Sequence, residues 1–224
     1  MIARLAPALC LLTALATSAA PDAGAQPAAP PAAAEHDGIG GDRGGRCHRK
    51  ELYGDQVAAW RRDVHAGALD TLRSERSLAI AKERGLAALP HEAPECLSCH
   101  VTAHGAAPER IAYELDPTDG VQCESCHGPG ADYRKKKIMS DVDEAVARGL
   151  WRADEDPAIC TACHNEKSPT WDPKRFVRPD GSSAGFDFEL GKARFPHAIP
   201  EEARGKVVEI EEERRRERKE AEGE

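Results

Sequence analysis

Short amphipathic stretches alternate with polar segments along most of this 224-residue chain. Apolar positions at helical spacing predict helices over residues 50–62, 69–84 and 132–150. Residues 101–122 lack a sustained period and predict a loop, while the Pro, Gly and Asp residues of 165–200 predict an irregular arm. The pattern therefore predicts a mostly α protein with long loops.

The two ends of the chain differ from this middle part. Residues 1–25 have the form of a secretory signal peptide, with Arg4 before a short apolar run and an A-x-A cleavage site at their end. Residues 26–43 are rich in Pro, Ala and Gly and predict a flexible linker. Residues 201–224 are densely charged and predict a solvent-exposed helical tail. These boundaries leave one domain over residues 44–200.

One five-residue pattern, C-x-x-C-H, occurs three times in that domain, and three copies make chance a negligible explanation. This pattern is the attachment signature of haem c, in which two thiols a turn apart add to the two vinyl groups. The adjacent imidazole then binds the iron as the proximal ligand. The predicted thioether residues are Cys96, Cys99, Cys123, Cys126, Cys160 and Cys163, and the predicted proximal ligands are His100, His127 and His164.

Composition agrees with a cofactor-filled interior. Aromatic residues make up only 4% of the chain and charged residues 31%, which is little core material for a protein of this size. Covalently held porphyrins would supply large apolar plates for side chains to pack against. The net charge of −8 gives no sign of a nucleic-acid partner.

A fourth, incomplete motif precedes the other three. Cys47 and His48 stand where the second cysteine and the histidine of a C-x-x-C-H would be, but Gly44 takes the place of the first cysteine. A single thioether through Cys47 with His48 on the iron would still hold a haem. Alternatively the site is empty and Cys47 is an odd free thiol. The expected count is therefore three haems, or four if this site is used.

The order of these motifs resembles the tetrahaem cytochrome c-554 family over roughly residues 40–200. The segments that carry the likeness are Cys47-His48 through Trp60 to His65, the motif at 96–100, the run Cys123-Glu124-Ser125-Cys126-His127-Gly128-Pro129-Gly130, and Cys163-His164 with the later Phe186 and His197. The resemblance implies a mostly α, irregular multihaem cytochrome c fold wound around stacked covalent haems, with electron transfer as its role. Gly44 departs from the family pattern, which has both cysteines in its first motif.

Four histidines remain as candidates for the distal side of the irons, once the motif histidines and His36 of the linker are set aside. His65 and His197 are favoured by the resemblance and by the neighbouring Trp60 and Phe195, and His104 and His91 are the other two. Iron with two imidazoles has no open position, which favours outer-sphere electron transfer over substrate binding.

The first functional hypothesis is thus a periplasmic carrier that passes electrons between redox partner proteins. The second is a haem enzyme in which one iron lacks its distal ligand and acts on a small nitrogen or sulfur compound. A third is a structural zinc site built from Cys96, Cys99, Cys123 and Cys126, or disulfides among the paired thiols. Stable membrane insertion is not expected, because the apolar run in 1–25 is too short to span a bilayer. The oligomeric state is left open.

Overall fold

The computed structural model describes residues 37, 47–112, 115–203 and 206–222. The expected signal peptide, nearly all of the linker, and Gly44 lie outside the described residues. The elements, in chain order, are η2 (Glu51–Tyr53), α2 (Gln56–Arg62), α3 (Ala68–Thr71), α4 (Glu75–Glu83), α5 (Pro94–His100), η3 (Pro108–Arg110), η4 (Pro117–Asp119), α6 (Glu124–His127), α7 (Lys136–Met139), α8 (Val142–Ala147), α9 (Pro157–Thr161), β1 (Phe176–Val177), β2 (Ser183–Ala184), α10 (Phe188–Arg194), η5 (Glu201–Ala203) and α11 (Val207–Glu222).

The prediction of a mostly α chain with long loops is confirmed, but the helices are shorter than the periodicity suggested. The pattern over 69–84 is divided at Ser74, whose side chain caps α4 by accepting a hydrogen bond from the Ser77 amide. The pattern over 132–150 is divided in the same way at Asp141, which caps α8. Ser and Asp side chains compete for backbone amides and so favour helix starts over helix interiors.

The first helical pattern, 50–62, is divided at Gly54 and Asp55. Gly54 has a φ of +92°, and a Cβ there would lie 2.6 Å from the carbonyl oxygen of Ala198. Only glycine permits both this backbone conformation and this close approach. Asp55 then caps α2 by accepting a hydrogen bond from the Ala58 amide. The start of α2 is therefore pressed against a segment from the far end of the domain.

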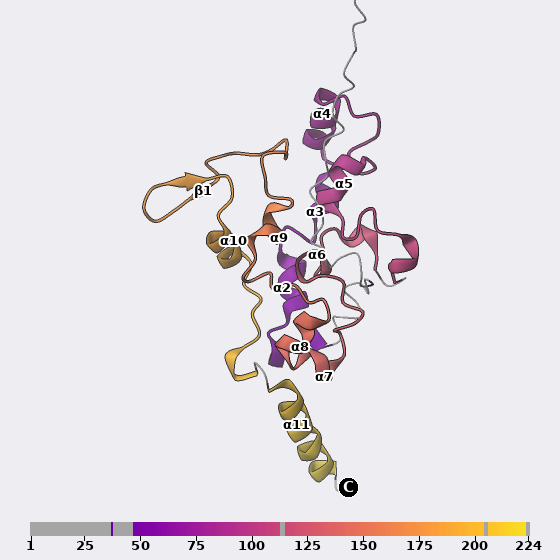
Figure 1. Ribbon diagram of the computed structural model, residues 1–224, viewed down its shortest axis with the longest axis vertical. Helices are drawn as coiled ribbons and strands as arrows, with labels where there is room; N and C mark the ends of the chain where they lie inside the picture. The colour runs from indigo at the N-terminus through magenta and orange to yellow at the C-terminus, as the bar shows by residue number, and fades with distance from the viewer. Residues whose placement is uncertain (1–36, 38–46, 113–114, 204–205, 223–224) are drawn as a thin grey trace, which may run out of the picture.

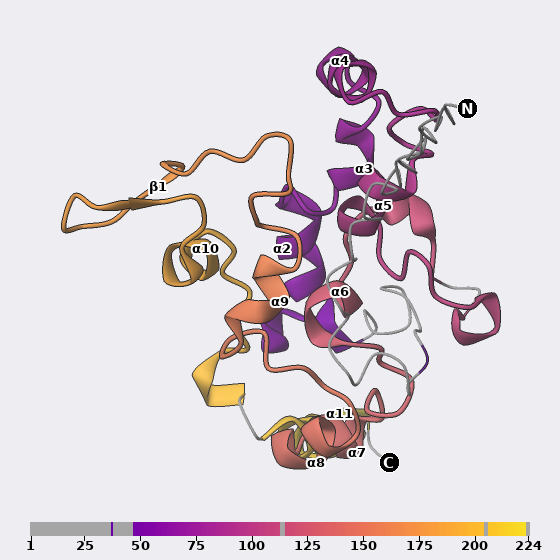
Figure 2. The ribbon, with the colours of Figure 1, turned by 45° about the horizontal axis from the view of Figure 1, so that its top comes forward.

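The middle of the molecule is formed by α2, α6 and α9, which lie together in both views (Figures 1 and 2). Figure 1 shows α4 and α11 at opposite ends of the long axis. Contacts join α6 to α9, which carry parts of the second and third complete motifs, and α3 to α5, which carries the first. None of the helices in the described ranges combines the length and apolar character that crossing a bilayer needs.

The hydrophobic core is small for a domain of this length. One buried cluster joins Tyr133, Ile138 and Ala145, with Met139 and Leu150 packed against it. This cluster holds α7 and α8 together. The other buried apolar side chains of the described ranges lie outside this cluster, and several large ones are exposed, as expected for a fold whose packing material includes a bound group.

The arm over 165–200 contains regular structure that its composition did not indicate. β1 pairs antiparallel with β2, with Phe176 opposite Ala184 and Val177 opposite Ser183, and this hairpin projects from the body in both views (Figures 1 and 2). Asp187 caps α10 by accepting a hydrogen bond from the Leu190 amide.

Within the charged tail, α11 covers Val207–Glu222. Its described side chains are exposed apart from the half-buried Ile210.

Candidate haem-binding site

Each complete motif lies on, or begins in, one short helix. α5 carries the whole of 96–100, and α6 continues from Cys123 to His127. α9 ends inside the third motif, where the His164 amide still donates to the Cys160 carbonyl at 2.9 Å. Residues three apart on a helix share a face. The two thiols of each motif therefore project on the same side.

The seven described cysteines are unpaired thiols. The Cys99 and Cys163 thiols, from the first and third complete motifs, hydrogen-bond to each other, which lowers the pKa of Cys99 and raises that of Cys163. Among the described residues, no three Cys, His, Asp or Glu side chains are arranged to hold a metal ion by themselves. The zinc arrangement of Cys96, Cys99, Cys123 and Cys126 therefore finds no support there.

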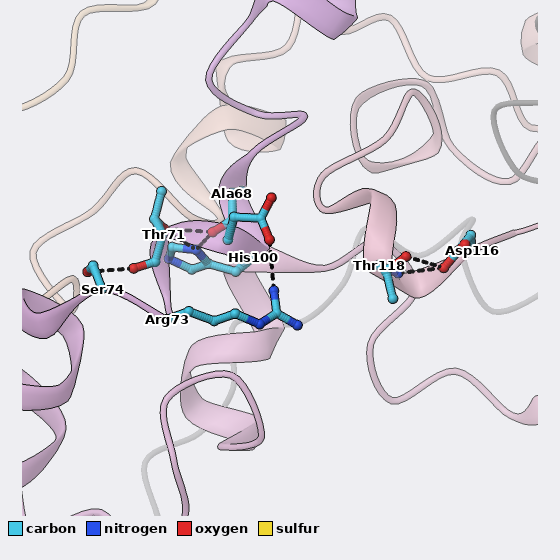
Figure 3. A network of polar contacts seen from close by, with 8 residues as sticks. Ala68, Thr71, Arg73, Ser74, His100, Asp116 and Thr118 are labelled. Atoms are coloured by element: carbon cyan, nitrogen blue, oxygen red, sulfur yellow. Dashed lines mark hydrogen bonds and ion pairs between the residues drawn. The ribbon is translucent and has the colours of Figure 1, made fainter.

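The imidazole of His100 is held by the turn at 65–68 and by α3, which begins at its last residue. Its Nδ1 donates to the Ala68 carbonyl oxygen at 2.7 Å, with the Thr71 hydroxyl 3.4 Å away (Figure 3). An imidazole whose Nδ1 carries the proton has its lone pair on Nε2. His100 therefore offers Nε2 to a metal.

His65, at the start of the same turn, faces His164. Their ring centroids are 5.9 Å apart and the ring planes are nearly perpendicular, at 88°. The Nδ1 of His65 lies 2.6 Å from the Asp63 carboxylate, which directs Nε2 of His65 away from Asp63. On its other side, the ring of His164 stacks on Phe186 at 5.0 Å.

The turn at 65–68 also contacts the chain before the second complete motif. The His65 carbonyl accepts the amide of Val121 at 3.1 Å. Gly120, with a φ of +69°, packs so closely that a Cβ would lie 2.8 Å from the Ala66 carbonyl oxygen. A single four-residue turn thus touches elements of all three motifs, through His164, through Ala68 to His100, and through Val121.

His127 faces His197. Their centroids are 6.0 Å apart at an interplanar angle of 69°, and His197 is oriented by a hydrogen bond from its Nδ1 to the Phe195 carbonyl oxygen at 2.9 Å. Burial, with smaller contributions from His197 and His48, lowers the pKa of His127 to about 4. The ring is therefore neutral at pH 7, as a metal ligand must be.

The backbone around His127 is fixed by its neighbours. The Trp151 amide donates to the His127 carbonyl at 3.0 Å, and the Tyr133 hydroxyl lies 2.9 and 2.8 Å from the carbonyl oxygens of His127 and Gly128. A Cβ on Gly128, whose φ is +76°, would lie 2.7 Å from the Gly149 carbonyl oxygen. The Gly128-Pro129-Gly130 turn therefore ends α6 at His127.

The two other distal candidates are placed differently. His91 has its Nε2 4.0 Å from a Glu92 carboxylate oxygen, and its Nδ1 is buried without a hydrogen-bond partner. His104 is half-buried in the loop after α5. Among the ring contacts of the described residues, none joins either imidazole to a motif histidine.

These observations test whether the residues fit haem c. Metal–imidazole nitrogen distances are about 2 Å, so two imidazoles on opposite sides of one iron have centroids about 6 Å apart. The observed separations of 5.9 and 6.0 Å agree with this value. His65, His100 and His197 each have Nδ1 engaged by an oxygen acceptor, which leaves Nε2 for iron. The buried, partnerless Nε1 of Trp151 beside Gly128 adds a donor to the same region. The residues fit the group.

Sequence reasoning did not identify the groups that orient the imidazoles. Asp63 precedes His65 by two residues in a turn, so its proximity gave a weak local signal. Gln56 lies eight residues after His48 on the next helix, and the Ala68 carbonyl lies 32 residues before His100. Neither relation has a sequence signature, because both depend on the tertiary fold.

Fold and site together fit a c-type cytochrome. Residues 44–128 match the family described as cytochrome c554 and c-prime. Over these residues the chain is similar to the cytochrome c-554 family, whose members carry covalently bound haem c and transfer electrons.

Cytochrome c-554 of Nitrosomonas europaea is 27% identical to this chain over 145 residues. The alignment covers 56% of this chain and 57% of the relative, so the chain spans little more than half the length of that protein. No solved structure matches the chain.

Proposed function

We propose that this protein is a periplasmic electron carrier with haem c attached at the three complete motifs, 96–100, 123–127 and 160–164. One observation carries the proposal: two motif histidines, His127 and His164, each face a second imidazole at the separation that one shared iron requires. Haem c supplies a reversible one-electron couple at each site.

The chain's own residues would set the environment of each couple. His65 and His197 would be the distal ligands opposite His164 and His127, held by Asp63 and by the Phe195 carbonyl. With a second imidazole as ligand, these two haems would exchange electrons and would leave no position for a substrate. Redox proteins are therefore the partners, and nucleic acid is not.

The site of His100 supports a second candidate function. Its proximal side is complete, yet no ring contact among the described residues brings another imidazole to it. An iron with an open position there would bind a small nitrogen or sulfur compound. A high-spin, five-coordinate signal in the purified protein favours this enzyme function, and a purely low-spin spectrum refutes it.

The number and place of the haems can be tested on full-length protein matured in a bacterium with haem-attachment machinery. Replacing both cysteines of one motif by alanine, for example Cys96 and Cys99, should remove one haem from the intact mass. Ser98→Ala, inside the same motif, is the matched control and should leave the mass of attached haem unchanged. A colourless protein with unmodified thiols at all three motifs would refute the proposal.

Location is tested by fractionation and by the N-terminal sequence of the mature protein. Haem-loaded protein in the periplasmic fraction, starting after residue 25, is the expected result. Haem-loaded protein that stays in the cytoplasm with Arg4 retained would refute export.

A further inference from the structure

The incomplete motif ends in an imidazole whose Nδ1 has an oxygen acceptor, as His100 of the first complete motif does. The Nδ1 of His48 lies 3.2 Å from the Oε1 of Gln56. The side-chain amide of Gln56 donates from Nε2 to the Tyr53 carbonyl oxygen, which can only accept. Gln56 must therefore present its oxygen to His48, so the proton lies on Nδ1 of His48 and the lone pair on Nε2.

An oxygen acceptor at Nδ1 is also present at His100, which belongs to a complete motif, and at His65 and His197, the proposed distal ligands. At His48 the acceptor comes from the first turn of α2, eight residues further along the chain. A solvated remnant of a lost site has no need of such an acceptor. The arrangement is that of a ligand with its supporting hydrogen bond.

The incomplete motif is also fixed in the body of the domain. Tyr53, which follows it, is only 2% exposed. Gly54 lies against Ala198 and Pro200, directly after the segment of His197. The amide of Lys50 donates to the Cys47 carbonyl at 3.1 Å, and this hydrogen bond closes the turn that begins at Cys47 and includes His48. Cys47 and His48 thus lie in a closed turn that joins them to the buried Tyr53.

We propose that Cys47 and His48 hold a further haem c through a single thioether bond, with Nε2 of His48 as the proximal ligand. This inference rests on the proposed function, because it requires the same attachment chemistry. The Cys47 thiol adds across one vinyl group: the sulfur bonds to the inner vinyl carbon, the thiol hydrogen goes to the outer carbon, and the C=C bond becomes single. Nothing leaves and no net oxidation occurs. The second vinyl group stays intact because Gly44 has no thiol.

The test is the mass of full-length, matured protein and of its proteolytic peptides. We expect four haems per chain and one haem on the peptide that contains Cys47. The haemochrome spectrum in alkaline pyridine should show a component at longer wavelength, because one haem keeps a vinyl group in conjugation. Three haems with a free thiol at Cys47 would overturn this inference and leave the proposed function intact, whereas a chain with no haem would overturn both.

Two substitutions that introduce a cysteine make the test sharper. Gly44→Cys restores the complete motif, and we expect the haem count to stay at four while the long-wavelength component disappears. Gly45→Cys adds a thiol at the wrong spacing and should keep that component. If Gly44→Cys instead raises the count from three to four, the natural site is empty and the inference fails. Cys47→Ala should lower the count by one, and an unchanged covalent count would also contradict the inference.

Discussion

Replacing His65 tests whether the facing imidazoles share an iron. His164 has two described ring neighbours, His65 and Phe186, and phenylalanine has no lone pair to offer. In His65→Gly the iron on His164 should therefore become five-coordinate and high-spin. The change should affect one haem per chain, or about a quarter to a third of the total iron for four or three haems. Electron paramagnetic resonance and visible spectra measure this fraction.

Asp63→Asn tests the same ligation with a smaller perturbation, because it weakens the binding of His65 to iron without removing the imidazole. Loss of a partner that supports a metal-bound histidine costs about 10–100-fold in metal affinity, which corresponds to about 1.4–2.7 kcal/mol. An external ligand such as carbon monoxide must displace His65, so its apparent affinity for this haem should rise by up to the same factor. Asparagine still accepts a hydrogen bond, so we expect a value near the lower end.

Two controls separate ligation from packing. Phe186→Leu alters the other face of the His164 ring and should leave every haem in its original spin state. Added imidazole should restore the low-spin signal of His65→Gly, which a merely unfolded variant would not do. If all haems of His65→Gly remain low-spin without added ligand, His65 is not an axial ligand and the 5.9 Å separation has another cause.

Three further outcomes follow from the packing. Burial raises the pKa of the Tyr133 hydroxyl, so the unfolded chain loses this proton first and unfolding free energy should fall as pH rises above about 10; Tyr133→Phe should weaken that decline in urea titrations. Gly128→Ala should destabilise by about 2–5 kcal/mol in the same titrations, and Gly181→Ala, which has a φ of +83° but open space, by about 1–2 kcal/mol; equal costs would contradict the crowding at Gly128. Protein with alanine at every motif cysteine should lack a cooperative thermal transition by circular dichroism, and a sharp transition would show that the side-chain core suffices.

The sequence located the three motifs and the α class because both depend on local spacing. Helix lengths were overestimated because caps such as Ser74 and Asp141 interrupt patterns whose apolar period continues across them. α10 went unnoticed in an arm rich in glycine and proline, although Asp187 supplies an N-cap there.

The sequence could not show which candidate distal histidine faces which motif histidine. His65 lies 99 residues before His164, and no period or composition relates two positions so far apart. The structure brings them together because the turn after α2 is anchored by Val121 and by the close approach of Gly120. Candidate ligands could be named from the chain, but their partners could be read only from tertiary contacts.

The turn at 65–68 makes the irons interdependent if the proposed ligation holds. Through His65 it would supply the distal ligand of the iron on His164. Through the Ala68 carbonyl it would orient His100, the proximal ligand of another iron. Reduction of one haem changes the charge beside this turn. A shift of the turn in response would move both His65 and the Ala68 carbonyl, and so would change the environment of the second haem. Uptake of successive electrons should therefore be cooperative, with midpoint potentials that cannot be tuned one at a time.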